Sequence, residues 1–121
     1  MILVDTSVWI GHFRSGNAEF GRILEQSLVL MHPFVIGELA CGGLRNRARV
    51  LADLNALPVS TPATHEEVMR MVTDKRLFGA GIGWTDANLL ASALLSNCRL
   101  WTMDAPLRRA AEAAGAKLYG V

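Results

Sequence analysis

Short apolar runs alternate along this chain with stretches in which apolar residues recur every three or four positions. The runs cover residues 1–4, 27–31, 56–59, 99–102 and 116–119 and are typical of strands buried on both faces. The intervening stretches have helical spacing, notably 17–26 and 105–114. A short helix is expected to follow Asp5 through Trp9 and Ile10, before a turn bracketed by Gly11 and Gly16. The alternation predicts an α/β fold of three layers, α/β/α, around a central parallel sheet of four to five strands.

Local signals place the ends of several of these elements. Pro33 suits the first turn of a helix that should end at the glycine pair 42–43. Thr64 and Glu67 form a capping box that should open another helix, and a further helix should begin near Thr85. Pro58 cannot donate to a strand ladder, so the strand 56–59 is expected at an edge of the sheet.

Length and composition fit one globular unit. The 121 residues suffice for a single domain, 1–121, and 51% of them are hydrophobic while 19% are charged. The formal net charge of +1 gives no general basic field, so any nucleic-acid binding must depend on a local patch or on metal. Cys41 and Cys98 lack a metal-binding spacing and are expected to be small core residues.

The sequence shows no membrane or export signal. No uncharged apolar stretch reaches the roughly 18 residues that a membrane helix needs. Asp5 interrupts the apolar start, and no basic segment precedes it, which is unlike a signal peptide. We therefore expect a soluble protein of the cytoplasm with no membrane partner.

Candidate chemistry lies in acidic residues embedded in apolar sequence, where a lone carboxylate is costly to desolvate. Asp5 and Asp104 follow predicted parallel strands, whose carboxyl ends meet at one edge of the sheet. Glu38 and Asp86 lie in helices that begin near that edge. We therefore expect the four carboxylates to share one cleft.

Four carboxylates in one cleft raise each other's pKa unless a cation lies between them. Such oxygen ligands suit Mg²⁺, with Mn²⁺ as an alternative, and no histidine or cysteine accompanies them to favour zinc. A divalent ion of this kind supports phosphodiester hydrolysis. Helix capping is the alternative role for three of these acids. Asp5, Asp86 and Asp104 all lie beside predicted helix starts, where an aspartate can accept hydrogen bonds from free backbone N–H groups.

The chain resembles the PIN-domain ribonucleases of the VapC toxin type over essentially all of its 121 residues. The segments that carry the resemblance are Ile2–Ser7, Val35–Leu39, Trp84–Leu94 and Leu100–Asp104. Each is weak alone, but their order and spacing together are specific.

The resemblance implies a Mg²⁺- or Mn²⁺-dependent endoribonuclease, the toxin of a type II toxin–antitoxin pair. It also implies a homodimer that a VapB-type antitoxin neutralises. Asp5, Glu38, Asp86 and Asp104 match the metal-binding and catalytic acids of the family. Thr6, Ser7 and Thr102 match positions that support those acids through hydrogen bonds.

Contacts to RNA and to partners are less specific in the sequence. Arginines that could bind phosphate are Arg45, Arg47, Arg49, Arg108 and Arg109, although a solvated helix face is the more common explanation for such residues. Aromatic residues that could stack on bases are Trp9, Trp84 and Trp101, with a core position favoured for Trp101. Dimer or antitoxin surface is expected at Phe34, Leu44, Leu77 and Phe78.

Other function classes remain open at this point. A catalytically silent PIN fold would bind partners only, and the intact acidic set argues against it. A metal-dependent adhesion module also places Asp-x-Ser after a first strand, but it requires a second serine where Trp9 stands. A response-regulator receiver requires paired acids after its first strand, and Asp5 is preceded by Val4.

Overall fold

A parallel sheet of four strands forms the centre of the protein, as described for residues 1–120 by a computed structural model. The strands lie in the order β2-β1-β3-β4 and all pair in parallel. Their bounds are β1 Ile2–Val4, β2 Val29–Leu30, β3 Arg99–Trp101 and β4 Lys117–Leu118. The predicted α/β class and parallel sheet are confirmed.

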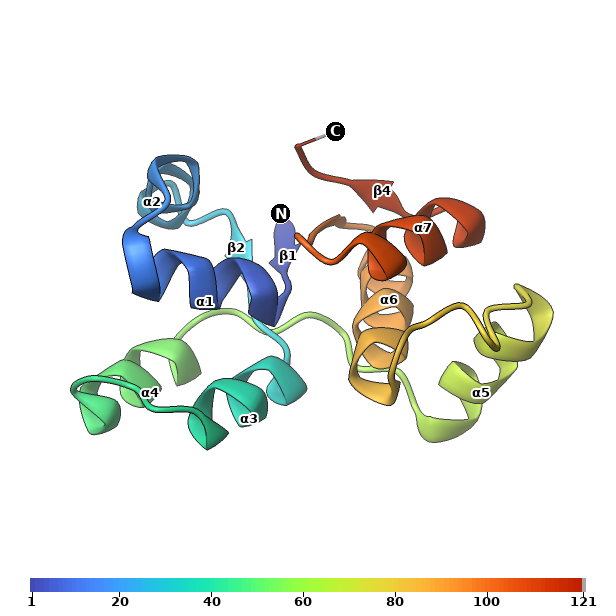
Figure 1. The fold of residues 1–121 in the computed structure, drawn as a ribbon, viewed down its shortest axis with the longest axis horizontal. Coiled ribbons are helices and arrows are strands. Elements are labelled where there is room, and N and C mark those ends of the chain that lie inside the picture. Colours follow the sequence, from blue (N-terminus) through green and yellow to red (C-terminus); the bar gives the residue numbers. More distant parts are fainter. Residues whose placement is uncertain (121) are drawn as a thin grey trace.

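Within the described residues, seven helices connect and cover these strands (Figure 1). They are α1 Thr6–Ser15, α2 Ala18–Glu25, α3 Pro33–Cys41, α4 Arg47–Asn55, α5 His65–Asp74, α6 Trp84–Ser96 and α7 Ala105–Ala114. Pro33 occupies the first turn of α3, and the capping box of Thr64 and Glu67 opens α5, as the sequence predicts.

The connections place helices on both faces of the sheet. The chain leaves β1 towards β2 through α1 and α2, then returns past β1 to β3 through α3–α6. Right-handed crossovers in opposite directions lie on opposite faces of a parallel sheet. Figure 1 accordingly shows α1 and α2 to one side of β1, with α6 and α7 to the other.

The hydrophobic core surrounds β1 and β3. Leu3, Val4 and Leu100 are completely buried, as are Leu89 and Leu90 of α6. A second, smaller cluster packs α5 on α6 through Val68, Ala87 and Ala91. In the described residues, no helix is both long enough and apolar enough to cross a membrane.

The strand predicted at 56–59 is wrong. Only Val59 pairs with a neighbour, through one isolated parallel bridge to Met31. Met31 N–H donates to the carbonyl of Pro58 at 2.8 Å, and Ser60 N–H donates to the carbonyl of Met31 at 2.9 Å. Pro58 has no N–H with which to extend this ladder, so the segment passes the edge of the sheet without becoming a strand.

The first helix is longer than the sequence suggests. We expected a short helix ending near Ile10 and a turn at Gly11, yet α1 continues through Gly11 to Ser15. It ends where Gly16 adopts a positive φ of 75°, a conformation that favours glycine. The extra turn carries Phe13 and Arg14 onto the surface, where Phe13 is 43% exposed.

His32 is buried and caps the N-terminus of α3, a role that the sequence analysis did not predict. It is 2% exposed at the start of α3, and its Nδ1 accepts a hydrogen bond from Phe34 N–H at 3.0 Å. Its Nε2 is buried without a hydrogen-bond partner. Burial lowers the pKa of His32 from its ordinary value, so the folded state favours the neutral ring.

The His32 side chain should make folding stability dependent on pH. Its pKa is lower in the folded than in the unfolded chain, so below an ordinary histidine pKa of about 6.5 only the unfolded chain gains the proton. The free energy of unfolding should therefore fall between about pH 7 and pH 5.5. His32→Asn keeps an oxygen that can accept from Phe34 N–H and should remove this part of the dependence.

Urea unfolding of wild type and variant across this pH range measures the effect. His65→Asn, a change at an exposed histidine, is the matched control. Identical pH dependence in the wild type and His32→Asn would contradict the assignment.

Candidate metal and nuclease site

Asp5 is the buried centre of the candidate site. It is 5% exposed, and its Oδ2 accepts hydrogen bonds from the Ser7 and Thr102 hydroxyls, each at 2.7 Å. Thr102 itself is completely buried. Two hydroxyl donors on one oxygen stabilise a carboxylate that would otherwise be costly to bury.

The pairing of β1 with β3 brings these residues together. Val4 and Trp101 are partners in the ladder, and Asp5 N–H donates to the Trp101 carbonyl at 2.8 Å. Asp5 and Thr102 are therefore the first residues beyond the ends of two adjacent strands. Although 97 positions separate them in sequence, parallel pairing places both at the carboxyl edge of the sheet.

Asp104 is connected to Asp5 through the same threonine. The Thr102 Oγ1 accepts from Asp104 N–H at 3.0 Å while it donates to Asp5. The Asp104 carboxylate accepts from Leu107 N–H at 3.1 Å and so caps α7. Arg108 in the first turn of α7 donates to the Thr102 carbonyl at 3.4 Å, which places a cation beside this group.

Glu38 approaches from the other side, on α3. Its Oε1 accepts a hydrogen bond from the Thr6 hydroxyl at 2.5 Å, and Thr6 is the first residue of α1. Glu38 is exposed, and it occupies the middle of its helix, where it caps nothing. The contact joins α3 to the segment that carries Asp5.

Asp86 lies in the first turn of α6, where the charges of the other three acids affect its pKa. Its pKa is raised, first by burial and then by the negative charges of Asp5, Asp104 and Glu38. A hydrogen bond from Gly83 N–H at 3.3 Å opposes this rise. The four carboxylates that the sequence singled out therefore lie within electrostatic range of one another.

The capping interpretation holds for two of the three aspartates. Asp104 accepts from Leu107 N–H, and Asp86 accepts from Gly83 N–H. Asp5 occupies the position before α1, but its side chain makes no capping hydrogen bond and binds Ser7 and Thr102 instead. Capping thus fails to explain Asp5 or Glu38, and it does not explain why four acids converge.

The donor chemistry of the site fits a hard divalent cation, since all four groups are carboxylates. Within residues 1–120, however, no three histidine, cysteine, aspartate or glutamate side chains meet closely enough to hold one ion as they stand. Each acid is instead held by a neighbour: Asp5 by two hydroxyls, Glu38 by Thr6, Asp86 and Asp104 by backbone amides. Coordination of one ion would therefore require side-chain rotation.

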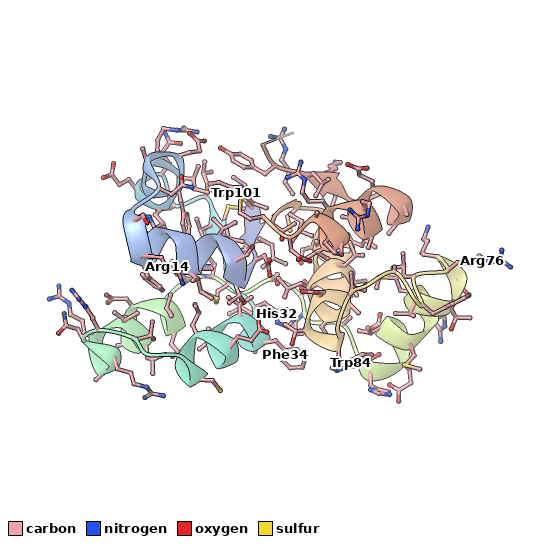
Figure 2. The ribbon with its side chains drawn as sticks, in the orientation of Figure 1. Arg14, His32, Phe34, Arg76, Trp84 and Trp101 are labelled. Atoms are coloured by element: carbon pink, nitrogen blue, oxygen red, sulfur yellow. The ribbon has the colours of Figure 1, made fainter. Side chains whose placement is uncertain are left out.

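Exposure separates the three tryptophans. Trp9 and Trp101 are 3% and 7% exposed and lie in the core, so the prediction that RNA could stack on Trp9 is wrong. Trp84, the first residue of α6, is 43% exposed (Figure 2). Phe34 and Phe78 are exposed as expected of partner surfaces. Leu77 is 3% exposed and belongs to the core, which corrects its assignment to such a surface. Cys98 is buried as expected, whereas Cys41, the last residue of α3, is exposed, so its predicted core position is wrong.

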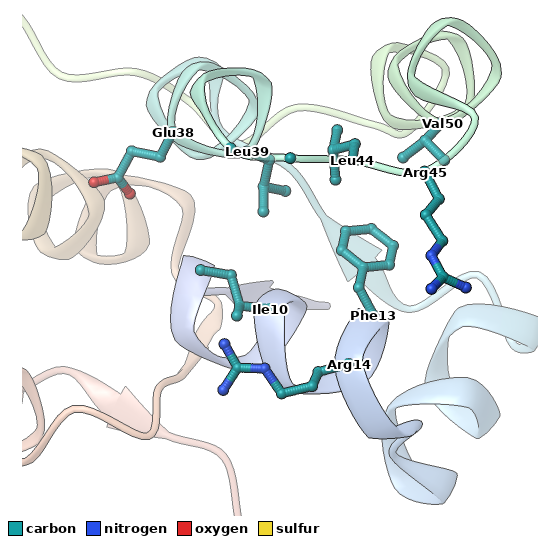
Figure 3. A pocket seen from close by; sticks show the side chains of 10 residues that line it. Ile10, Phe13, Arg14, Glu38, Leu39, Leu44, Arg45 and Val50 are labelled. Atoms are coloured by element: carbon teal, nitrogen blue, oxygen red, sulfur yellow. The ribbon is translucent and has the colours of Figure 1, made fainter.

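A groove that the sequence did not predict opens beside Glu38. It lies between α1 and the segment from α3 to α4 and has a volume of about 430 Å³. Figure 3 shows Ile10 and Phe13 on its α1 side, facing Leu39 and Leu44. The sequence signal for this groove is the three-residue spacing of the apolar Ile10 and Phe13. The spacing places both side chains on one face of α1, but only because the helix continues past Gly11.

Comparisons with known proteins agree on one family for this chain. The PIN domain family model matches residues 2–113. The chain is 47% identical over 122 aligned positions to Ribonuclease VapC32 of Mycobacterium tuberculosis, and the match is the same for the protein of two strains. The alignment covers 98% of this chain and 96% of the relative.

Two solved structures share the fold at 19% sequence identity. FitAcB from Neisseria gonorrhoeae aligns with a TM-score of 0.64 over 99% of this chain and 97% of its own. PAE2754 from Pyrobaculum aerophilum aligns with a TM-score of 0.61 over 90% of this chain and 78% of its own. With its fold, its family match and its curated relative in agreement, this chain belongs to the PIN-domain family, in its VapC group.

Proposed function

We propose that this protein is a metal-dependent endoribonuclease, the toxin of a type II toxin–antitoxin pair, that hydrolyses phosphodiester bonds in RNA. The observation that carries the proposal is the convergence of four carboxylates at the carboxyl edge of the sheet, where Asp5, Asp104 and Glu38 add to the effect of burial in raising the pKa of Asp86. Like charges at one edge of a sheet destabilise the fold, and a function that needs a cation there explains why they are kept. The name of the curated relative supports ribonuclease activity.

The proposed roles follow from where each side chain is held. Asp5 and Asp86 are the principal ligands for Mg²⁺, or for Mn²⁺, and Asp104 binds directly or through water. Glu38, the most exposed of the four acids, positions the attacking water and accepts its proton. When bound, the ion lowers the pKa of water and stabilises the charge that develops on phosphate.

Three hydroxyl groups orient these acids in the proposed site. Thr102 fixes Asp5 and the backbone of Asp104, Ser7 donates to the same Asp5 oxygen as Thr102, and Thr6 holds Glu38. Hydrogen bonds of this kind set the direction of a carboxylate and are commonly as important as the ligand itself.

We further propose that the protein acts in the cytoplasm as one unit, 1–121, and as a homodimer that a VapB-type antitoxin neutralises. Such partners would cover the exposed apolar side chains, among which Phe34 is 40% and Phe78 66% exposed. The alternative is a silent PIN fold that binds partners without cleaving RNA. The cleavage experiment below decides between the two.

Cleavage should require both the metal and Asp5. Purified protein incubated with a mixed RNA pool should give discrete fragments with Mg²⁺ or Mn²⁺ and none with EDTA. Asp5→Asn should reduce the rate by more than the roughly 10–100-fold typical of losing a supporting residue. Asp74→Asn, the same change at an exposed position of α5, is the matched control. Equal cleavage by Asp5→Asn would point to a contaminating nuclease and refute the assignment.

Thr102→Val tests whether activity depends on the orientation of the Asp5 carboxylate. The change keeps the shape of the side chain but removes the donor to Asp5 and the acceptor of Asp104 N–H. We expect a loss of activity of roughly 10–100-fold and a destabilisation of about 1–3 kcal/mol. Rates under single-turnover conditions and urea unfolding measure the two effects, and exposed Thr73→Val should change neither.

The clustering of acids also predicts opposite effects on stability and on metal binding. In EDTA, Asp86→Asn should raise the melting temperature by a few degrees, since it removes a charge that its neighbours disfavour. Mn²⁺ should then raise the melting temperature of wild type but not of the variant, because a ligand stabilises only the state that binds it. Asp53→Asn on α4 is the control, and equal stabilisation of Asp86→Asn by Mn²⁺ would exclude Asp86 as a ligand.

A further inference from the structure

The groove beside Glu38 has features that the acidic site alone does not use. It is lined by apolar side chains of α1, α3 and α4, and Glu38 forms one end of it. Two arginines belong to the same lining, Arg14 at the end of α1 and Arg45 in the loop before α4 (Figure 3). The groove is therefore continuous with the proposed catalytic centre and carries positive charge.

Neither arginine is neutralised by the protein. Among residues 1–120, the single ion pair joins Arg22 to Glu19, and neither guanidinium of the groove makes a hydrogen bond. Exposed arginines without partners are ordinary on a protein surface. Here, however, two of them flank an apolar groove that begins at a carboxylate of the site.

The electrostatics of the site require such cations. Four carboxylates at one edge of the sheet repel a phosphate backbone, while the formal net charge of the whole chain is only +1. An anionic strand can be held at this edge only where positive groups lie next to the acids. Arg14 and Arg45 are placed to supply them, and the Arg108 side chain lies on the other side, beside Thr102.

Phe13 supplies a flat surface inside the groove. Its ring lies 5.7 Å from the Trp9 ring and tilted by 38°, and 43% of the residue remains exposed. Trp9 is buried and fixes Phe13 from beneath. Aromatic side chains with one supported face are the usual platforms for the bases of single-stranded nucleic acids.

From these observations we infer that the groove is a subsite for one unpaired nucleotide next to the scissile phosphate. The base stacks on Phe13 and contacts Ile10, while Arg14 and Arg45 bind the flanking phosphates. A volume of about 430 Å³ lies in the range of sites for small ligands, and only an unpaired base exposes a face that can stack on Phe13. The inference rests on the proposed nuclease function and adds a preference for single-stranded RNA.

The test measures RNA affinity without cleavage. Fluorescence anisotropy of a short fluorescein-labelled single-stranded RNA is recorded in EDTA, with the same RNA annealed as a duplex for comparison. Phe13→Leu, which keeps apolar bulk but removes the ring, should weaken single-strand binding by about 5- to 100-fold. Phe13→Tyr should bind as wild type does, and the duplex should bind weakly to all variants.

Substitution of the two arginines should change the salt dependence of RNA binding. Arg14→Gln and Arg45→Gln should each reduce the slope of log affinity against log salt by about 0.7, the value expected for one lost phosphate contact on a single strand. The matched controls are Met69→Leu and Arg70→Gln, at exposed positions of α5 outside the groove. They should change neither the affinity nor the slope, and the melting temperature of each variant shows that it is folded.

The outcomes separate this inference from the proposed function. RNA binding that Phe13→Leu leaves unchanged would overturn the subsite and assign the apolar groove to a protein partner instead. An equal loss of single-strand and duplex affinity would overturn the stacking role. A wild type that binds RNA through the groove yet cleaves no RNA with Mg²⁺ or Mn²⁺ would refute the nuclease activity and keep the subsite.

Discussion

The burial of one carboxylate determines the construction of this site. Asp5 is almost fully removed from water at the end of β1, and an ion in that position is tolerated only with charge-assisted hydrogen bonds. Thr102 and Ser7 supply them, one from the next strand and one from the following helix. The register of β1 against β3 is thus coupled to the chemistry, because a shift of one residue would remove Thr102 from Asp5.

The other acids add repulsion rather than stability. Asp86 is disfavoured as a charged group by its own burial and by three neighbours, and the amide of Gly83 offsets only part of this. Local hydrogen bonds keep Glu38 and Asp104 in place without bringing them into contact with Asp86. The arrangement therefore has the character of a site under electrostatic strain, which proteins retain where function requires it.

Much of the fold was predictable from the sequence, because apolar runs and capping signals act locally. The pattern placed α3 from Pro33, α5 after Thr64 and α7 at 105–114. It failed at residues 56–59, where an apolar run meets a proline at the sheet edge. It also ended α1 too early, since Gly11 is compatible with a helix that tertiary packing of Val8 and Trp9 stabilises.

The candidate acids were recognisable because each interrupts an apolar segment, and parallel strands have their carboxyl ends at one edge. The partners of those acids could not be derived with the same certainty. Whether Asp5 caps α1 or binds Thr102 depends on a contact across 97 positions, which no local pattern encodes. The groove beside Glu38 was hidden for a similar reason, since its walls come from α1 and from the α3–α4 segment.

The failed strand at 56–59 has a consequence for how molecules of this protein meet one another. β2 forms one border of the sheet, and an open border offers free backbone groups to the strands of other molecules. The segment from Pro58 to Ser60 occupies the backbone groups of Met31, while Ser60 is tied to Ser92 of α6 at 2.7 Å. Because Pro58 cannot donate in turn, the sheet ends there, and a strand of another molecule cannot pair with the backbone of Met31.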